Sequence, residues 1–128
     1  MIVDTSAIIA IVFKEPGHEE LIQKMSKAET LGIGTPTLAE TGIVLSARLG
    51  SGGKTILARL AQELGLVQIP FGDAHWKEAV EAYERFGRGR HPARLNFGDC
   101  LTYATAKLAG DPLLYAGKDF AKTDLDRA

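Results

Sequence analysis

Short apolar runs alternate with longer amphipathic segments along the chain. Each short run is followed by a turn residue or a helix-capping residue, a pattern that predicts buried strands. The longer segments repeat apolar residues at the three- and four-residue spacing of a helix. We therefore expect strands at 2–3, 31–34, 66–69 and 113–115, and helices at 6–13, 18–27, 35–49, 55–64, 73–86 and 97–109.

This order of elements predicts an α/β fold with a parallel sheet, because parallel strands need crossover connections that helices supply. We expect a single domain over residues 1–128. Ligands of such sheets bind at the carboxyl ends of the strands. Asp4 follows the first expected strand and Asp119 lies shortly after the last, so both should point toward that edge.

Local chemistry adds detail to two of the helices. Thr5 or Ser6 is expected to cap the first helix, and Asn96 the helix over 97–109. On the helix over 73–86, four large apolar side chains share one stripe, which we expect to face the core: Trp76, Val80, Tyr83 and Phe86.

Three isolated carboxylates stand in apolar segments. Asp4, Glu40 and Asp99 are each the only charged residue in their stretch, and Glu40 shares a helical stripe with Ile43 and Val44 that should face the core. An unpaired buried carboxylate costs several kcal/mol, so these acids must be capped, protonated or bound to a cation. Asp4 and Asp99 could each simply cap a helix. If the three converge, their all-oxygen chemistry favours Mg²⁺ or Mn²⁺ over zinc.

Because the chain is nearly neutral overall, any site for nucleic acid must be a local patch of basic residues. A formal net charge of −1 gives no overall positive field that would draw the molecule onto nucleic acid. Five basic or imidazole side chains gather without an acid among them just before the helix over 97–109, and we expect them to contact RNA: Arg85, Arg88, Arg90, His91 and Arg94.

Other features exclude several classes of protein. The segment 50–55 resembles a phosphate-binding P-loop but carries Arg48 where that motif needs glycine, and it follows a helix rather than a strand. A single cysteine, Cys100, favours a reducing cytoplasm over secretion. The apolar start is too short to span a membrane, and we expect none to be involved.

The residues above resemble those of the PIN-domain ribonucleases, specifically the VapC-type toxins of bacterial toxin–antitoxin pairs. The resemblance spans nearly the whole chain and rests on an ordered set of motifs: Ile2-Val3-Asp4-Thr5-Ser6-Ala7, Thr37-Leu38-Ala39-Glu40-Thr41, Gly87-Arg88-Gly89-Arg90-His91-Pro92-Ala93 before Leu95-Asn96-Phe97-Gly98-Asp99-Cys100, and Leu113-Leu114-Tyr115-Ala116-Gly117-Lys118-Asp119-Phe120. Each motif alone is weak, but the ordered set is specific.

The resemblance implies a PIN domain, a three-layer α/β/α sandwich around a short, mostly parallel sheet. It implies an acidic quartet of Asp4, Glu40, Asp99 and Asp119 that binds Mg²⁺ or Mn²⁺, with Thr5 or Ser6 supporting the first acid. It further implies cleavage of RNA, a homodimer, and inhibition by a VapB-type antitoxin whose C-terminal segment occupies the active-site groove. Asp124 matches a further acidic position of the family but is left outside the quartet.

Two alternatives stay open at this point. One is a PIN-domain nuclease with a housekeeping role in RNA processing. The other is a non-catalytic, receiver-like module that binds Mg²⁺ and a phosphoryl group. The second is disfavoured because Asp4 stands alone and Gln68-Ile69-Pro70 supplies no acceptor aspartate.

Overall fold

The computed structural model describes all residues from Met1 to Ala128. Four short strands form one sheet in the order β3-β2-β1-β4, and every neighbouring pair is parallel. The strands are β1 (Ile2–Val3), β2 (Gly32–Gly34), β3 (Val67–Ile69) and β4 (Leu113–Leu114). The expected parallel α/β architecture is confirmed.

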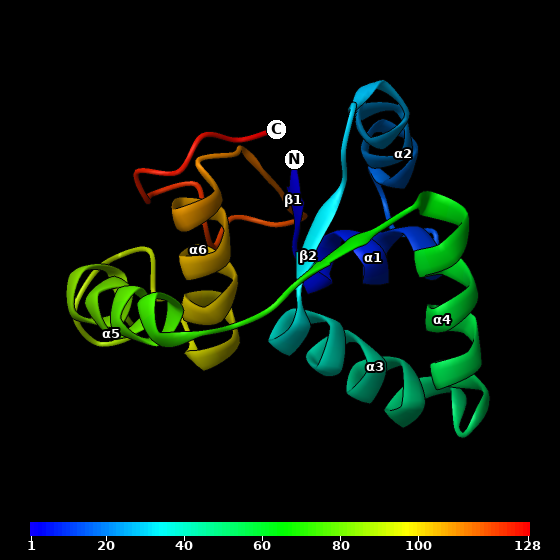
Figure 1. The fold of residues 1–128 in the computed structure, drawn as a ribbon, viewed down its shortest axis with the longest axis horizontal. Helices are drawn as coiled ribbons and strands as arrows, with labels where there is room; N and C mark the ends of the chain where they lie inside the picture. The colour runs from blue at the N-terminus through cyan, green and yellow to red at the C-terminus, as the bar shows by residue number, and fades with distance from the viewer.

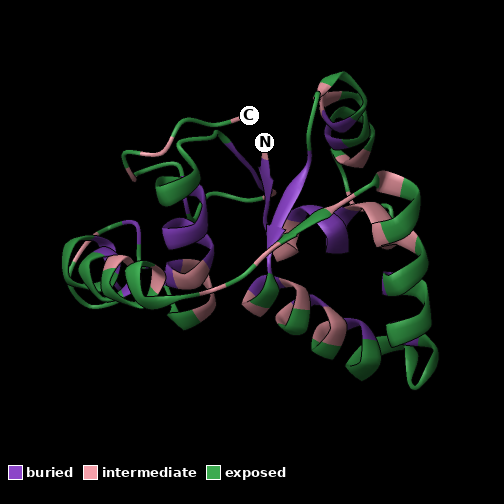
Figure 2. Ribbon diagram, in the orientation of Figure 1, coloured by how far each residue is buried: buried purple, intermediate pink, exposed green.

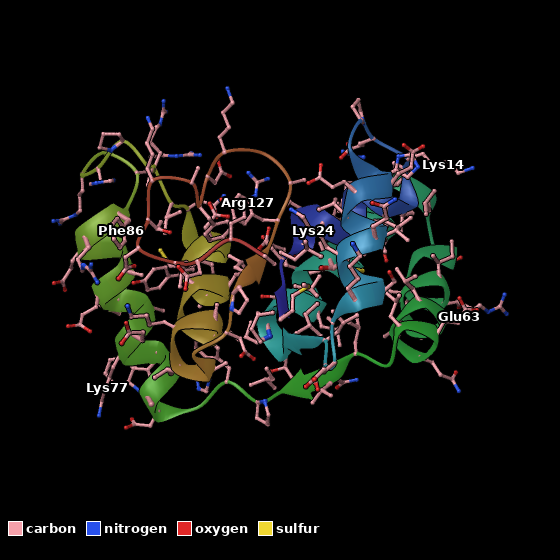
Figure 3. The ribbon with its side chains drawn as sticks, turned by 90° about the horizontal axis from the view of Figure 1, so that it is seen from above. Lys14, Lys24, Glu63, Lys77, Phe86 and Arg127 are labelled. Atoms are coloured by element: carbon pink, nitrogen blue, oxygen red, sulfur yellow. The ribbon has the colours of Figure 1, made fainter.

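Six helices connect and cover the strands (Figure 1). Their bounds are α1 (Thr5–Val12), α2 (His18–Lys27), α3 (Thr35–Leu49), α4 (Gly52–Leu64), α5 (Asp73–Phe86) and α6 (Phe97–Ala109). Helices α5 and α6 pack on one face of the sheet, while α1 to α4 lie on the other face. The side chains labelled in Figure 3 show the length of the molecule, with Lys77 of α5 at one end and Glu63 of α4 at the other.

Strands β1 and β4 each contribute side chains to two separate cores, as the two-residue period of a strand requires. Ile2 and Leu113 belong to the core beneath α5 and α6. Val3 and Leu114 belong to the core shared with α1 and α2. The central strands are accordingly buried on both faces (Figure 2), which explains why they read as continuous apolar runs.

Most sequence-predicted boundaries agree with the structure, but the expected start of the fourth helix is wrong. Helix α4 begins at Gly52 rather than near Thr55, and Gly53 allows its first turn to lie against α3. A Cβ atom on Gly53 would lie 2.6 Å from the main chain of Leu45 and Ser46, so only glycine lets α4 approach α3 this closely. The segment is a helix–helix connection, as expected, and not a P-loop.

Two expected core faces are also wrong for most of their residues, although the burial expected for Phe86 is confirmed. Trp76, Val80 and Tyr83 are 53%, 50% and 44% exposed, because α5 packs on α6 through Ala79, Ala82 and Phe86. Small alanines allow close helix packing and leave the larger side chains at the rim.

On α3 the buried face is Thr37, Thr41 and Leu45, whereas Ile43 is 71% exposed. Glu40 therefore lies at the border of the buried face and not within it.

Candidate active site

Asp4 lies between β1 and α1, and hydrogen bonds to β4 and α1 fix its position. Its backbone N–H donates to Leu114 O of the neighbouring strand at 3.0 Å. Its side chain is the N-cap of α1, with Oδ2 accepting from Ser6 N at 3.0 Å and from Ser6 Oγ at 2.6 Å. The cap is thus Asp4 and not Thr5 or Ser6, because its side chain is the one that reaches the free N–H groups of the first turn. Oδ1 of this buried residue has no hydrogen-bond partner in the protein and keeps contact with solvent.

Ser6 links Asp4 to the segment that carries Asp119. While its hydroxyl donates to Asp4, the same oxygen accepts a hydrogen bond from Ala116 N at 3.0 Å. Ala116 directly follows the buried Tyr115 after β4. One serine therefore aligns the ends of β1 and β4, and with them two of the four acids.

Glu40 is held by Thr5, the neighbour of Asp4. The Thr5 hydroxyl lies 2.8 Å from Glu40 Oε1 and donates to it. The other oxygen, Oε2, packs against Gly98, and a Cβ atom at that position would contact the Glu40 carboxylate carbon at 2.9 Å. Gly98 therefore gives the carboxylate of α3 the room to lie beside the first turn of α6, next to Asp99.

Asp99 lies in the first turn of α6, where its backbone and side chain form a capping box with Asn96. Asp99 N donates to Asn96 Oδ1 at 2.8 Å, and Asn96 N donates to Asp99 Oδ2 at 3.1 Å. The capping role expected for Asn96 is confirmed, and Asp99 takes part in it while its Oδ1 stays free.

The charge of Asp99 is opposed by its burial and by the other three acids of the quartet. Partial burial is the largest influence on Asp99; together with the negative charges of Asp4, Asp119 and Glu40 it outweighs the hydrogen bond from Asn96 and raises the pKa of Asp99 to about 7. Burial and the charge of Asp99 also raise the pKa of the adjacent Cys100 thiol to about 11, which makes that thiol a poor nucleophile at neutral pH.

Asp119 lies on an exposed turn after β4, anchored by the buried Phe120. Its side chain makes no hydrogen bond within the protein, and it lines a cavity of about 330 Å³ together with Asp99. In Asp4, Glu40 and Asp99, one carboxylate oxygen of each side chain accepts a hydrogen bond within the protein. The fourth acid, Asp119, is positioned only by its backbone.

The basic residues expected to contact RNA divide into two groups. Arg88 and Arg94 line the cavity beside Asp99 and Asp119. The other three make contacts within the protein. Arg85 lies 3.4 Å from Asp124, Arg90 stacks over the Tyr83 ring, and the Nδ1 atom of His91 accepts from Ala93 N.

Asp124 belongs to a separate cluster that fastens the C-terminal segment to α6. Its carboxylate accepts from the Tyr103 hydroxyl at 2.6 Å and from Lys107 Nζ at 2.8 Å. Burial alone would raise the pKa of Asp124, but these hydrogen bonds and the charges of Lys107 and Arg85 outweigh it and lower the pKa to about 2. This ion-paired carboxylate stays outside the quartet.

Sequence reasoning missed two sets of residues around the site. The first set is buried threonines that join the two helices carrying Glu40 and Asp99: Thr37 Oγ1 on α3 lies 2.9 Å from Thr102 Oγ1 on α6. Lys118 and Lys122 line the cavity of Asp99 and Asp119. The threonines could have been found as polar residues on otherwise apolar helix faces, whereas the lysines carry no signal because exposed turns are commonly basic.

The donor chemistry of the site suits a hard divalent cation. Its four acids and their supporting hydroxyls offer oxygen ligands only, with no histidine or reactive thiolate nearby. No group of three or more His, Cys, Asp or Glu side chains is placed to hold an ion by itself. Mg²⁺ commonly takes only one or two carboxylates and retains water molecules, so the free oxygens of Asp4 and Asp99 fit it.

Comparison with known proteins agrees with the fold. The PIN domain family model matches residues 1–125, so the chain belongs to the PIN domain family. Within that family it is a member of the VapC ribonucleases. VapC ribonuclease Mb2004c of Mycobacterium bovis and ribonuclease VapC36 of Mycobacterium tuberculosis are each 47% identical to it over 127 residues, which is 98% of this chain and 91% of theirs.

Solved structures support the same fold. VapC20 of Mycobacterium tuberculosis, described as a sarcin-ricin loop cleaving toxin, superposes with a TM-score of 0.80 at 20% identity, over 99% of this chain and 97% of that one. VapBC2 of Rickettsia felis, solved with a promoter DNA fragment, gives 0.77 at 16% identity, over 99% and 96%. None of the helices of this protein has the length and apolar character that a membrane crossing demands.

Proposed function

We propose that this protein is a divalent-metal-dependent endoribonuclease that hydrolyses RNA phosphodiester bonds, and that it is the toxin of a VapBC pair. The observation that carries the proposal is the convergence of Asp4, Glu40, Asp99 and Asp119 from four separate segments at the carboxyl edge of the sheet. Such a concentration of negative charge destabilises a protein unless a cation joins it. Membership of the VapC ribonucleases favours the toxin role over a housekeeping role or a receiver-like switch.

The residues of the quartet divide the work in this proposal. A bound Mg²⁺ or Mn²⁺ would supply Lewis acidity, orienting the phosphodiester and a water molecule and stabilising the leaving oxygen. Asp4 and Asp99 are the direct ligands, since each keeps one free oxygen while a helix-terminal hydrogen bond orients the other. Glu40 and Asp119 complete the site directly or through water. Ser6 and Thr5 hold Asp4 and Glu40 in place.

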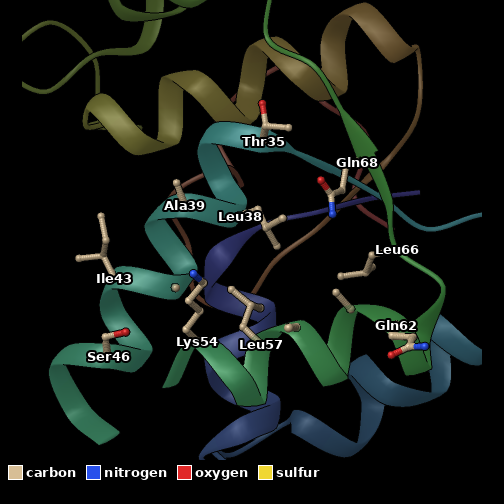
Figure 4. A pocket seen from close by; sticks show the side chains of 13 residues that line it. Thr35, Leu38, Ala39, Ile43, Ser46, Lys54, Leu57, Gln62, Leu66 and Gln68 are labelled. Atoms are coloured by element: carbon tan, nitrogen blue, oxygen red, sulfur yellow. The ribbon is translucent and has the colours of Figure 1, made fainter. Parts of the chain in front are cut away.

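A VapB-type antitoxin is the proposed inhibitor, and a groove between α3 and α4 offers it an apolar surface. The groove has a volume of about 830 Å³, and Leu38, Leu57 and Leu66 contribute to its lining (Figure 4). It suits the apolar face of a helix. Ala39, which also lines it, directly precedes Glu40, so a segment following such a helix could reach the acids. Ile43→Glu, at a 71% exposed position, should abolish co-purification with the antitoxin without unfolding the toxin.

A homodimer is the proposed assembly, and the uncovered face of α5 and α6 is its candidate interface. Trp76, Val80, Tyr83 and Phe97 are between 44% and 79% exposed there, and they surround an apolar cavity of about 380 Å³. A patch of this kind can cover itself about a two-fold axis. Sedimentation of Trp76→Glu should show a monomer where the unmodified protein sediments as a dimer. A reducing cytoplasm, where RNA is available, remains the prediction for its location.

Cleavage of defined RNAs by the purified toxin tests the central proposal. We expect cleavage with Mg²⁺ or Mn²⁺, none with chelator, and none by a folded Asp4→Asn variant. Unchanged turnover by Asp4→Asn, or full activity in chelator, would contradict the assigned roles. Formation of a stable acyl phosphate with a small phosphodonor, without RNA cleavage, would instead support the receiver-like alternative.

A further inference from the structure

The cavity beside Asp99 and Asp119 is lined by four basic side chains. Arg88 and Arg94 come from the loop between α5 and α6, and Lys118 and Lys122 come from the segment after β4. The four cations outnumber the two acids in the cavity lining, so the lining carries an excess of positive charge. The whole chain, in contrast, carries a formal net charge of −1. The positive charge is therefore concentrated next to the proposed site of cleavage.

None of these four cations forms an ion pair. The protein's ion pairs involve the N-terminus, His18, Lys24, Lys77, Arg85 and Lys107. Two acids line the same cavity, yet neither lies within 4.0 Å of a cationic nitrogen there. Unpaired cations surrounding a cavity are free to bind an anionic ligand, which distinguishes them from Arg85, whose charge Asp124 already neutralises.

The backbone holds both pairs of cations in place. The loop is closed at its base by hydrogen bonds from Arg88 N to Leu95 O and from Leu95 N to Phe86 O. Arg94 adopts a left-handed conformation with φ of 55°, which is rare for a residue with a side chain and is often found at functional sites. On the other side, Ala121 N donates to Lys118 O at 3.1 Å and the buried Phe120 anchors the turn.

We propose that Arg88, Arg94, Lys118 and Lys122 form a subsite that binds backbone phosphate groups of the RNA strand beside the cleaved bond. The inference rests on the proposed ribonuclease function and extends it to named substrate contacts. Apart from Pro92 and Ala93, every residue lining the cavity has a polar or charged side chain. No aromatic surface is present on which a base could stack, so the subsite reads the charge of the strand and not its sequence.

Binding of a short single-stranded RNA, measured by fluorescence anisotropy over a range of salt concentrations, tests the subsite. The full chain carries Asp4→Asn in every sample, which separates binding from cleavage. The test pair is Arg94→Gln with Lys118→Gln. The matched control pair is Arg59→Gln with Lys27→Gln, which removes the same charges from exposed, unpaired positions on α4 and α2.

Each lost phosphate contact should lower the salt dependence of single-strand binding by about 0.7 in log K per log salt. The test pair should therefore lower the slope by about 1.4 and weaken binding roughly 20-fold at 0.1 M salt, equally for RNAs of different sequence. The control pair should change neither value. A thermal melt checks that each variant is folded. If Arg94→Gln disturbs the loop between α5 and α6, the pair Lys118→Gln with Lys122→Gln leaves that loop unchanged and tests the same fall in salt slope and affinity.

The outcomes separate this inference from the proposed function. Equal slopes for the test and control pairs would overturn the subsite, whether or not the unmodified protein cleaves RNA. A loss confined to particular RNA sequences would also overturn it, because phosphate contacts are common to all. Failure of the unmodified protein to cleave any RNA with Mg²⁺ would count against the ribonuclease, while the binding slopes would still decide the subsite.

Discussion

Replacement of Asp99 by asparagine should make the metal-free protein more stable while abolishing its nuclease activity. Asparagine keeps a side-chain oxygen that can accept the hydrogen bond from Asn96 N, so the capping box survives. What disappears is a negative charge that partial burial and three neighbouring acids oppose. Opposite effects on stability and activity would identify Asp99 as a residue kept for function.

The size and sign of the stability change follow from the pKa. The pKa of Asp99 rises from 3.8 to about 7 on folding, so folding favours the protonated carboxyl group. The wild type therefore loses stability as pH rises between these values, and the full loss is present above pH 7. The rise corresponds to at most about 4 kcal/mol. Because Asp99 keeps some contact with solvent, we expect about 2 kcal/mol.

Thermal and urea melts in chelator at pH 8 and pH 4.5 provide the assay. At pH 8 the variant should melt roughly 5–10 °C above the wild type, and the difference should shrink at pH 4.5, where most wild-type Asp99 is already protonated. Asp126→Asn, at an exposed carboxylate with no side-chain partner, is the control and should change little. Added Mg²⁺ should stabilise the wild type and not the variant.

Two results would refute the reasoning. A variant that is no more stable than the wild type at pH 8 in chelator would show that burial and the neighbouring acids do not disfavour the charged form of Asp99. Retained RNA cleavage would show that Asp99 is not a metal ligand, since loss of groups that merely orient a ligand already costs about 10–100-fold.

Two further substitutions test the supports of the site, and a third tests the separate Asp124 cluster. Ser6→Ala should lower stability by about 1–2 kcal/mol and lower activity, because Asp4 loses a hydrogen bond; unchanged melts and turnover would dismiss the link. Gly98→Ala should reduce cleavage at least about tenfold by displacing the Glu40 carboxylate, with circular dichroism showing an intact fold. Asp124→Asn should cost about 0.5–1 kcal/mol at pH 7. This loss should vanish in melts as pH falls from 3.8 toward 2, because folding lowers the pKa of Asp124 to about 2.

The sequence was most informative where a residue contradicts its surroundings. Asp4, Glu40 and Asp99 attract attention because each is a lone charge in an apolar segment, and the structure brings them together with Asp119. Asp119 itself lies in a polar turn, so only the resemblance to the PIN domain pointed to it.

Helix faces were predicted less well than helix boundaries, because a face depends on the packing partner. Periodicity placed α5 at Asp73–Phe86, but it could not tell which of two apolar stripes the alanines of that helix would bury. The role of Gly98 was equally hidden, since it depends on contact with Glu40, 58 positions earlier in the chain.

The position of β1 between β2 and β4 has a consequence for the cell that makes this protein. Asp4 is synthesised well before the neighbouring strand β4, the Ser6 contact at Ala116 and the acid Asp119, which all emerge more than a hundred residues later. The nascent chain therefore cannot bring the four acids together until the segment that carries Asp119 has been synthesised. Until that point, the proposed metal site stays incomplete in the nascent chain.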